Sequence, residues 1–147
     1  MAFRSALSLA LLGALLAVPA ATAQAVNEAT GLWQTQAGDA RVRVSKCGGA
    51  ICATVASLRD KLDPQTGKPA IDDKNPDPAK ATRSIIGIHL FIDMRPTAPG
   101  RWSGQIYNAD DGKTYTSNIS LAGSDTLRVE GCVGAFCGGE NWSRVGK

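Results

Sequence analysis

Two short stretches at opposite ends of the chain decide the fold: Gly31-Leu32-Trp33 and Trp142-Ser143-Arg144. A Gly-x-Trp on a first strand and an arginine on a last strand suggest a sheet that closes on itself, with the Trp33 indole plugging one end. The Arg144 guanidinium would stack on that indole as a cation–π pair and donate its remaining N–H groups to nearby carbonyls. We therefore expect four residues to close a barrel: Gly31, Trp33, Trp142 and Arg144.

The first 23 residues have the pattern of a secretory signal peptide. Arg4 provides a positive start, residues 6–21 are apolar, and Ala21-Thr22-Ala23 fits the small-x-small cleavage rule. The apolar run is short for a bilayer span and no stop-transfer pattern follows it; a retained membrane anchor is the alternative. We expect a cleaved signal peptide at residues 1–23, one β-barrel domain at residues 24–147, and a periplasmic or secreted protein.

The charge and size of the mature part limit the classes of function that it can have. Residues 24–147 suffice for one domain with one hydrophobic core. The full chain has 16 Lys and Arg against 13 Asp and Glu, a net charge of +3, and loss of Arg4 lowers it to +2. The basic residues are scattered, so we expect no nucleic-acid partner. There is no second apolar span, which predicts no stable membrane insertion after signal cleavage.

The four cysteines fall in two near-copies of one pattern, Cys-x-Gly-Ala-apolar-Cys, at residues 47–52 and 132–137. An even number of cysteines in an exported chain favours disulfides. Each Gly-containing segment is typical of a hairpin tip, where a four-residue turn would place two cysteines opposite each other. We favour the local pairs Cys47–Cys52 and Cys132–Cys137. A four-Cys zinc site is the alternative, but its paired ligands are usually closer in sequence, and we expect no metal.

The mature chain consists largely of short segments in which apolar and polar residues alternate, and turns separate these segments. In Arg41-Val42-Arg43-Val44, for example, the valines should face inward and the arginines water. The expected strands cover residues 31–36, 41–47, 51–58, 84–93, 101–108, 113–121, 126–132 and 141–145. This predicts an all-β, antiparallel up-and-down meander of about eight strands closed into a barrel, whose interior holds side chains or one small ligand. An open sandwich is the alternative.

Residues 59–83 are rich in proline, aspartate and glycine and predict one long loop. Long ordered loops are often functional. Asp72, Asp73, Asn75 and Asp77 lie close enough in sequence to suggest a Ca²⁺ site, although the central Gly and distal Glu of an EF-hand loop are missing. We favour turn chemistry, in which these side chains accept hydrogen bonds from their own backbone.

Residues 84–93 form the strongest apolar run, and their β-branching and flanking prolines favour a strand. Both faces are apolar, so we expect the outer face to be covered, for example by the long loop. His89, the single histidine, lies here. Paired with Asp93 it could suggest acid–base chemistry, yet residues i and i+4 of a strand lie about 13 Å apart. We favour a structural or ligand-lining role for His89.

The central aromatic residues are the other candidates for ligand contact. Trp102, Tyr107 and Tyr115 could line the mouth of a pocket together with His89, whereas Trp33 and Trp142 fit the core better. The chain has no phosphate-binding Gly loop, no Gly-x-Ser-x-Gly elbow and no His-Glu-x-x-His motif. We therefore predict no catalytic residues and no cofactor.

A set of short segments spread over nearly the whole mature chain is specific when taken together. The segments are Gly31-Leu32-Trp33, Cys47-Gly48 with Ile51-Cys52, Asp73-Lys74-Asn75-Pro76-Asp77-Pro78, Gly87, Trp102-Ser103-Gly104 with Ile106-Tyr107-Asn108, Asp111-Gly112-Lys113-Thr114-Tyr115, Leu127, Gly131 and Trp142-Ser143-Arg144. In this set the chain resembles an uncharacterised family of small exported bacterial proteins, a domain of unknown function. The resemblance implies a compact barrel similar to the lipocalin and streptavidin group, and lipocalins in general carry small apolar molecules. It implies no catalytic residues, and Cys132 and Cys137 are not a firm feature of the family.

Three functions are compatible with these observations. The first is a barrel that binds a small, partly apolar ligand, which requires a cavity of about 300–1,000 Å³. The second is a protein-interaction or cell-envelope accessory module without a small-molecule ligand, which requires an exposed apolar patch. The third is an enzyme that uses His89, which requires polar or acidic groups converging on the imidazole.

Overall fold

The computed structural model describes residues 28–147, so the predicted signal peptide at residues 1–23 lies outside the described part. Eight strands follow one another along the chain: β1 (Gly31–Gln34), β2 (Ala40–Cys47), β3 (Ala50–Leu58), β4 (Phe91–Ala98), β5 (Arg101–Asn108), β6 (Lys113–Leu121), β7 (Thr126–Val133) and β8 (Phe136–Gly146). Among the described residues, no helix has the length and apolar character needed to cross a membrane.

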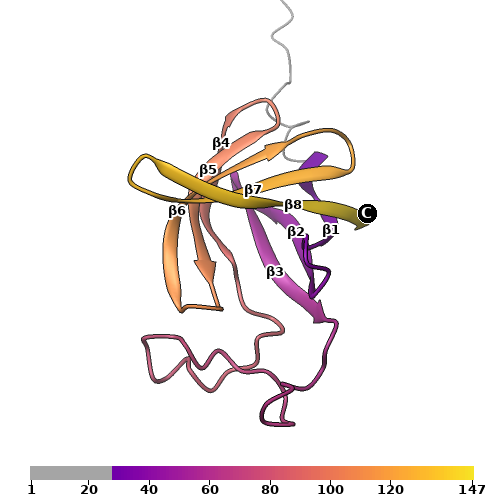
Figure 1. Cartoon of the computed structure of the whole chain (residues 1–147). Coiled ribbons are helices and arrows are strands. Elements are labelled where there is room, and N and C mark those ends of the chain that lie inside the picture. Colours follow the sequence, from indigo (N-terminus) through magenta and orange to yellow (C-terminus); the bar gives the residue numbers. More distant parts are fainter. Residues whose placement is uncertain (1–27) are drawn as a thin grey trace, which may run out of the picture.

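Every strand pairs antiparallel with the next one in sequence, and β1 also pairs with β8, which closes the sheet into a barrel (Figure 1). At the closing seam Trp33 lies opposite Arg144, and Gln34 lies opposite Ser143. The predicted all-β, up-and-down barrel is therefore confirmed, and the open sandwich is wrong. A closed barrel leaves no free sheet edge.

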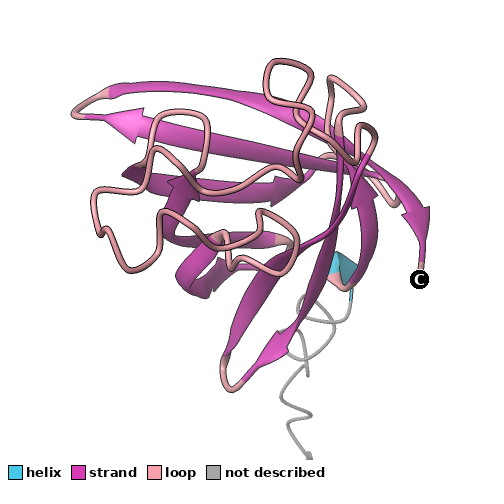
Figure 2. Cartoon of the chain, turned by 90° about the horizontal axis from the view of Figure 1, so that it is seen from below, coloured by secondary structure: helices cyan, strands magenta, loops and turns pink. Residues whose placement is uncertain are grey.

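The up-and-down order divides the connections between two ends of the barrel. The β1–β2, β3–β4, β5–β6 and β7–β8 connections lie at one end, which we call the open end, and the remaining turns lie at the closed end. The β3–β4 connection spans residues 59–90 and lies across the open end. Figure 2 views the barrel from this side, with the long loop in front of the strands.

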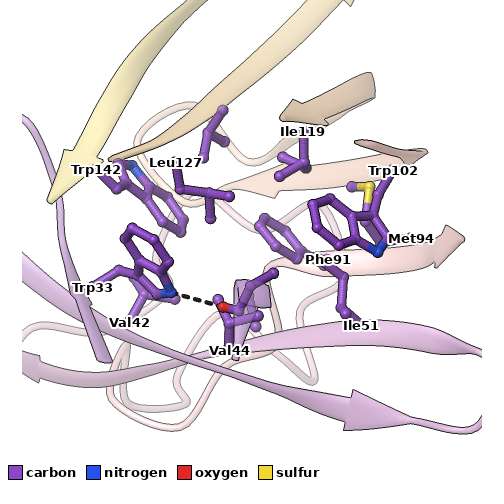
Figure 3. Packing of buried hydrophobic residues seen from close by; sticks show 13 residues of the cluster. Trp33, Val42, Val44, Ile51, Phe91, Met94, Trp102, Ile119, Leu127 and Trp142 are labelled. Atoms are coloured by element: carbon purple, nitrogen blue, oxygen red, sulfur yellow. Dashed lines mark hydrogen bonds between the residues drawn. The ribbon is translucent and has the colours of Figure 1, made fainter. Parts of the chain in front are cut away.

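The core follows the alternation that the sequence predicts. Val42 and Val44 are buried on β2, whereas Arg41 and Arg43 between and beside them are exposed. Trp33, Trp142 and Phe91 meet in the middle of the cluster, with the Phe91 and Trp142 rings stacked at 5.9 Å between centroids (Figure 3). This packing fills the interior of the barrel from the closed end to the middle, so an interior cavity can remain only near the open end.

Arg144 and Trp33 form the predicted cation–π pair at the barrel seam. The guanidinium carbon lies 4.2 Å from the centre of the indole. Arg144 Nε donates to the Ser124 carbonyl at 2.8 Å, Nη1 donates to the Thr30 carbonyl at 2.7 Å, and Nη2 donates to the Glu28 carbonyl. Trp33 Nε1 donates to the Ala29 carbonyl at 2.9 Å (Figure 3). A single side chain thus ties two backbone segments, the residues before β1 and the β6–β7 turn, to the plug of the barrel.

Gly31 is the fourth residue of this closure. Its φ of +140° is rarely adopted by other residues, and a Cβ at this position would lie 2.7 Å from Arg144 Nη1. Such an approach is below any normal contact distance. Glycine therefore leaves the space through which the Arg144 guanidinium reaches the Thr30 carbonyl.

The cysteines form the predicted local disulfides, Cys47–Cys52 at the closed end and Cys132–Cys137 at the open end. The predicted four-residue turns are wrong, because both hairpins turn through two residues, 48–49 and 134–135. Cys132 and Cys137 do lie directly opposite each other. Cys47 instead lies opposite Ala50, while Cys52 lies opposite Ser45, so this disulfide crosses the ladder diagonally.

The predicted strand at residues 84–93 is wrong over most of its length. The regular strand is β4, which begins only at Phe91 and continues to Ala98. Gly87 has a φ of +97°, which interrupts an extended backbone. Residues 87–90 still bond irregularly along β3, since Val55 N donates to Ile88 O at 3.1 Å and Leu90 N donates to Ala53 O at 2.8 Å. The apolar run therefore forms the last part of the long loop.

Candidate functional site

A cavity of about 600 Å³ lies at the open end of the barrel. Its walls come from the inner faces of the strands and from the end of the long loop. The apolar side chains that line it include Val42 and Val55 of β2 and β3, Ile85, Ile88 and Leu90 of the loop, Ile106 of β5 and Val129 of β7. A volume of this size is in the range of small-molecule sites in proteins.

Aromatic and acidic side chains add polar groups to this wall. Tyr107, Tyr115, Phe136 and Trp142 contribute aromatic rings, and Asp39, Asp110 and Glu140 contribute carboxylates. Trp142 Nε1 donates to Glu140 Oε1 at 2.5 Å, and Thr35 Oγ1 donates to Asp39 Oδ1 at 2.5 Å. The cavity is therefore apolar in its depth and carries both hydrogen-bonding groups and negative charge.

The long loop is fastened to the barrel by a buried carboxylate. Asp72 is fully buried, and its Oδ1 accepts a hydrogen bond of 2.5 Å from the Tyr107 hydroxyl. Asp72 Oδ2 is held by Arg83 Nη2 at 2.9 Å and by Asn75 Nδ2 at 2.9 Å. Burial of Tyr107 raises the pKa of its hydroxyl above the ordinary value of 10.0, and the hydrogen bond to Asp72 adds to this. This network fixes the loop beside the cavity.

A second contact holds the same loop against the β5–β6 turn. Gly112, with a φ of +71°, lies so close to the loop backbone that a Cβ there would come within 1.8 Å of the Lys74 carbonyl oxygen. The hydroxyl of Tyr115, on strand β6, donates to Asp111 of this turn, which raises the pKa of Tyr115 and lowers the pKa of Asp111. The loop and the turn thus form one continuous rim.

Two of the four residues considered for calcium, Asn75 and Asp77, are engaged in the predicted turn chemistry, whereas the Asp72 carboxylate is held by side chains and Asp73 pairs with Lys74. Asn75 Oδ1 accepts from the backbone N–H of Asp77 at 3.0 Å, and Asp77 Oδ1 accepts from the N–H of Ala79 at 3.0 Å. Residues 28–147 contain no group of three or more His, Cys, Asp or Glu side chains arranged to hold a metal ion. Sequence reasoning missed the anchoring role of Asp72, because its partner Tyr107 lies 35 residues further along the chain.

The four residues expected to contact a ligand are not gathered in one place. Tyr107 and Tyr115 line the cavity. Trp102 is 1% exposed and belongs to the core cluster. His89 is exposed on the outer side of β3, with Nδ1 3.4 Å from Thr54 Oγ1. Ligand contact by any of the four stays a prediction.

A second hollow, of about 910 Å³, lies at the closed end. It is bounded by the turns at residues 99–100 and 123–125 and by both ends of the described chain. Pro99 and Leu121 are its apolar side chains, and Arg144 lies in its wall. Because Arg144 already bonds three carbonyls and the indole of Trp33, this hollow belongs to the closure of the barrel.

These features define a class of protein: a small eight-stranded up-and-down β-barrel, closed at one end, with an apolar-walled cavity at the other. Residues 31–144 match the family described as an uncharacterized protein conserved in bacteria (DUF2147), and the chain belongs to this family. The family resemblance found in the sequence is thereby confirmed.

A solved structure shares this fold. It is described as "Protein HP1028 from the human pathogen Helicobacter pylori belongs to the lipocalin family" and is 24% identical in sequence, with a TM-score of 0.66. The similarity covers 79% of this chain and 82% of that protein. At this level of identity the comparison shows a lipocalin-like barrel and nothing further. No curated protein matches the chain.

Proposed function

We propose that this protein binds one small, partly apolar ligand in the open-end cavity and does so after export to the periplasm. The observation that carries the proposal is the cavity of about 600 Å³ inside a closed barrel. A cavity this large and this apolar is costly to leave in a small protein unless a ligand or solvent occupies it. The likeness to a lipocalin-family structure adds support.

The disulfides support the compartment in this proposal. Both pairs are oxidised and the described part of the chain has no free cysteine. Disulfides persist in oxidising compartments such as the bacterial periplasm. Export agrees with the signal-like pattern at residues 1–23.

Fluorescence of N-phenyl-1-naphthylamine tests the proposal, because this uncharged probe brightens in an apolar site. We expect saturable, one-to-one binding to the wild-type protein. Gly131 lines the cavity in strand β7, and a Cβ there would make only ordinary contact, 3.4 Å from Tyr115 Cβ. Gly131→Ile should therefore fold and fill part of the cavity, weakening probe binding about tenfold or more.

Thr116→Ile is the matched control, since Thr116 is exposed on the neighbouring strand β6. It should bind the probe like the wild type. Absence of saturable binding, or equal loss in both variants, would refute the cavity as the site.

A protein-interaction or cell-envelope module is the second candidate. The observation that favours it is the tip of the β7–β8 hairpin, where Val133 is 68% exposed and Phe136 is 85% exposed. Large exposed apolar side chains of this kind occur at docking sites. Both residues also line the cavity, so the first proposal accounts for them as its rim. Phe136→Ser separates the two: it should abolish a protein partner's binding but only modestly weaken probe binding.

An enzyme that uses His89 has less support. The described contact of the His89 ring is with the Thr54 hydroxyl, at 3.4 Å. His89 lies in a shallow surface depression with Arg83 and Ser84 rather than in the open-end cavity. General acid–base catalysis requires a substrate position within hydrogen-bonding reach of the imidazole, and this depression offers an apolar ligand little enclosure.

A further inference from the structure

The charges around the open-end cavity do not follow those of the protein as a whole. The full chain has a net charge of +3, and Arg4 is the one charged residue that lies outside residues 28–147. The described residues therefore also carry a net positive charge. The residues that line the cavity nevertheless include three acids, Asp39, Asp110 and Glu140, and no Lys, Arg or His. These acids come from three separate segments, namely the β1–β2 turn, the β5–β6 turn and strand β8.

None of the three carboxylates forms an ion pair with a described residue. Glu140 accepts one hydrogen bond, from Trp142 Nε1 at 2.5 Å, and Asp39 accepts one from Thr35 Oγ1 at 2.5 Å. The buried Asp72 shows the contrast, since Arg83 neutralises it at 2.9 Å. Asp39 and Asp110 are exposed at the mouth of the cavity and Glu140 is half-buried, so these three charges face solvent and can be approached by a ligand. A cleft lined by charges of one sign also concentrates ligands of the opposite sign.

Aromatic rings share this wall with the carboxylates. Tyr107, Tyr115, Phe136 and Trp142 all line the cavity. Aromatic faces attract ammonium groups, and clusters of aromatic rings with carboxylates recognise alkylated ammonium ions. The remaining wall is aliphatic, which suits an apolar body.

From this combination we infer that the ligand of the open-end cavity is a cationic amphiphile, an apolar body that carries an ammonium group. The inference rests on the proposed function and specifies its ligand class. The apolar body contacts the aliphatic wall, and the ammonium group lies near the carboxylates and aromatic rings. An anionic amphiphile, such as a fatty acid, would bring a second negative charge to the same region and is disfavoured.

Displacement of bound N-phenyl-1-naphthylamine by three ten-carbon compounds tests this inference at pH 7 and low salt. Decyltrimethylammonium, 1-decanol and decanoate share a tail and differ in the charge of the head group. We expect decyltrimethylammonium to displace the probe at a concentration roughly tenfold lower than decanoate, since a charge pair separated by several ångströms near a protein surface gives an effect of this size. 1-Decanol should fall between them.

Two triple variants complete the test. Asp39→Asn, Asp110→Asn, Glu140→Gln keeps the acceptor oxygens and removes the cavity charges, and the difference between the two ionic compounds should shrink to within about threefold. Asp60→Asn, Asp73→Asn, Asp93→Asn changes the net charge equally at exposed positions outside the cavity, and the difference should persist.

The outcomes separate this inference from the proposed function. If the probe binds and 1-decanol displaces it, but decanoate competes as well as the ammonium compound, the cationic ligand is refuted and the binding barrel stands. A difference that survives in the cavity variant refutes the role of the three carboxylates. If the probe does not bind at all, both the proposed function and this inference fail.

Discussion

Arg144 meets three structural needs of the barrel seam with one side chain. It stacks on Trp33, donates to backbone carbonyls of residues before β1 and in the β6–β7 turn, and lies opposite Trp33 in the β1–β8 ladder. Its planar guanidinium can do all of this at once, whereas a lysine ammonium cannot stack and donate in several fixed directions. The residue pair at the two ends of the chain therefore stabilises the contact that closes the sheet.

Arg144→Lys should lower the free energy of unfolding by about 2 kcal/mol, from weaker cation–π attraction and the loss of hydrogen bonds to carbonyls. Urea unfolding followed by tryptophan fluorescence measures this. Arg41→Lys, at an exposed position of β2, should change the value by less than about 0.5 kcal/mol. Equal stability of the Arg144→Lys variant and the wild type would show that this side chain does not stabilise the seam.

Tyr107 is one of three side chains, with Arg83 and Asn75, that hold the carboxylate of the buried Asp72. Tyr107→Phe removes one hydrogen-bond donor from Asp72. Near pH 8 it should lower the free energy of unfolding by about 1–3 kcal/mol, the usual penalty for a buried acceptor that loses a partner. Tyr115→Phe should cost less, because its hydrogen bond to Asp111 lies at the surface. Urea unfolding of the two variants at the same pH makes the comparison, and a larger loss in Tyr115→Phe would contradict it.

The raised pKa of Tyr107 gives this contribution a pH dependence. Folding holds the hydroxyl neutral, so its contribution is complete below the unfolded value, near 10.0, and is lost as the pH rises through the folded pKa. The stability gap between the wild type and Tyr107→Phe should therefore narrow above pH 10. A gap that stays constant or widens between pH 8 and pH 11 would show that the folded pKa of Tyr107 is not raised.

At the scale of elements, the long loop is a fixed part of the open end. Gly112→Ala would place a Cβ 1.8 Å from the Lys74 carbonyl oxygen and add the cost of a left-handed backbone. Gly48→Ala adds the same backbone cost, at a φ of +63°, with no atom within 4 Å. Gly48→Ala should lower the free energy of unfolding by about 1–2 kcal/mol. Gly112→Ala should lower it by more, and should also increase the rate of hydrogen exchange in residues 59–90. Equal losses would mean that the loop is not clamped there.

The two disulfides close equally short segments at opposite ends of the barrel. Chain-entropy reasoning gives each about 2 kcal/mol, so the Cys47→Ser, Cys52→Ser variant and the Cys132→Ser, Cys137→Ser variant should lose similar stability. Cys137 lines the cavity and Cys47 and Cys52 do not. Only the second variant should weaken binding of N-phenyl-1-naphthylamine, measured by titration at a temperature where both variants are folded. Equal binding by the two variants would indicate that the hairpin tip does not shape the site.

The strands could be predicted because their signal is local. Alternation along β2 and turn residues such as Asp111-Gly112 mark elements within a few residues, and Trp33 with Arg144 indicated closure. Residues 84–90 misled the prediction because Ile85, Ile88 and Leu90 line the cavity from the loop, and periodicity does not distinguish this from burial in a sheet. The Asp72 anchor and the three cavity carboxylates depend on residues far apart in sequence, so no local pattern shows them.

At the scale of the whole molecule, the barrel and the long loop together form the walls of the open-end cavity. Packed aromatic and aliphatic side chains occupy the closed end and the middle (Figure 3), and the loop of residues 59–90 is held over the open end by Asp72 and Gly112. The cavity of about 600 Å³ is walled by the strands and the loop and opens to solvent at the rim. Ligand binding should therefore require little rearrangement of the barrel.

Methyl-detected NMR during titration with 1-decanol tests the central claim most directly, because a protein of this size gives resolved methyl signals. We predict saturable shifts for methyl groups that line the cavity, namely those of Val55, Ile88, Ile106 and Val129, and unchanged signals for the exposed Ile71, Ile86 and Ile92. Shifts confined to those exposed isoleucines, or no saturable shift at any methyl group, would contradict the claim that the open-end cavity is a ligand site.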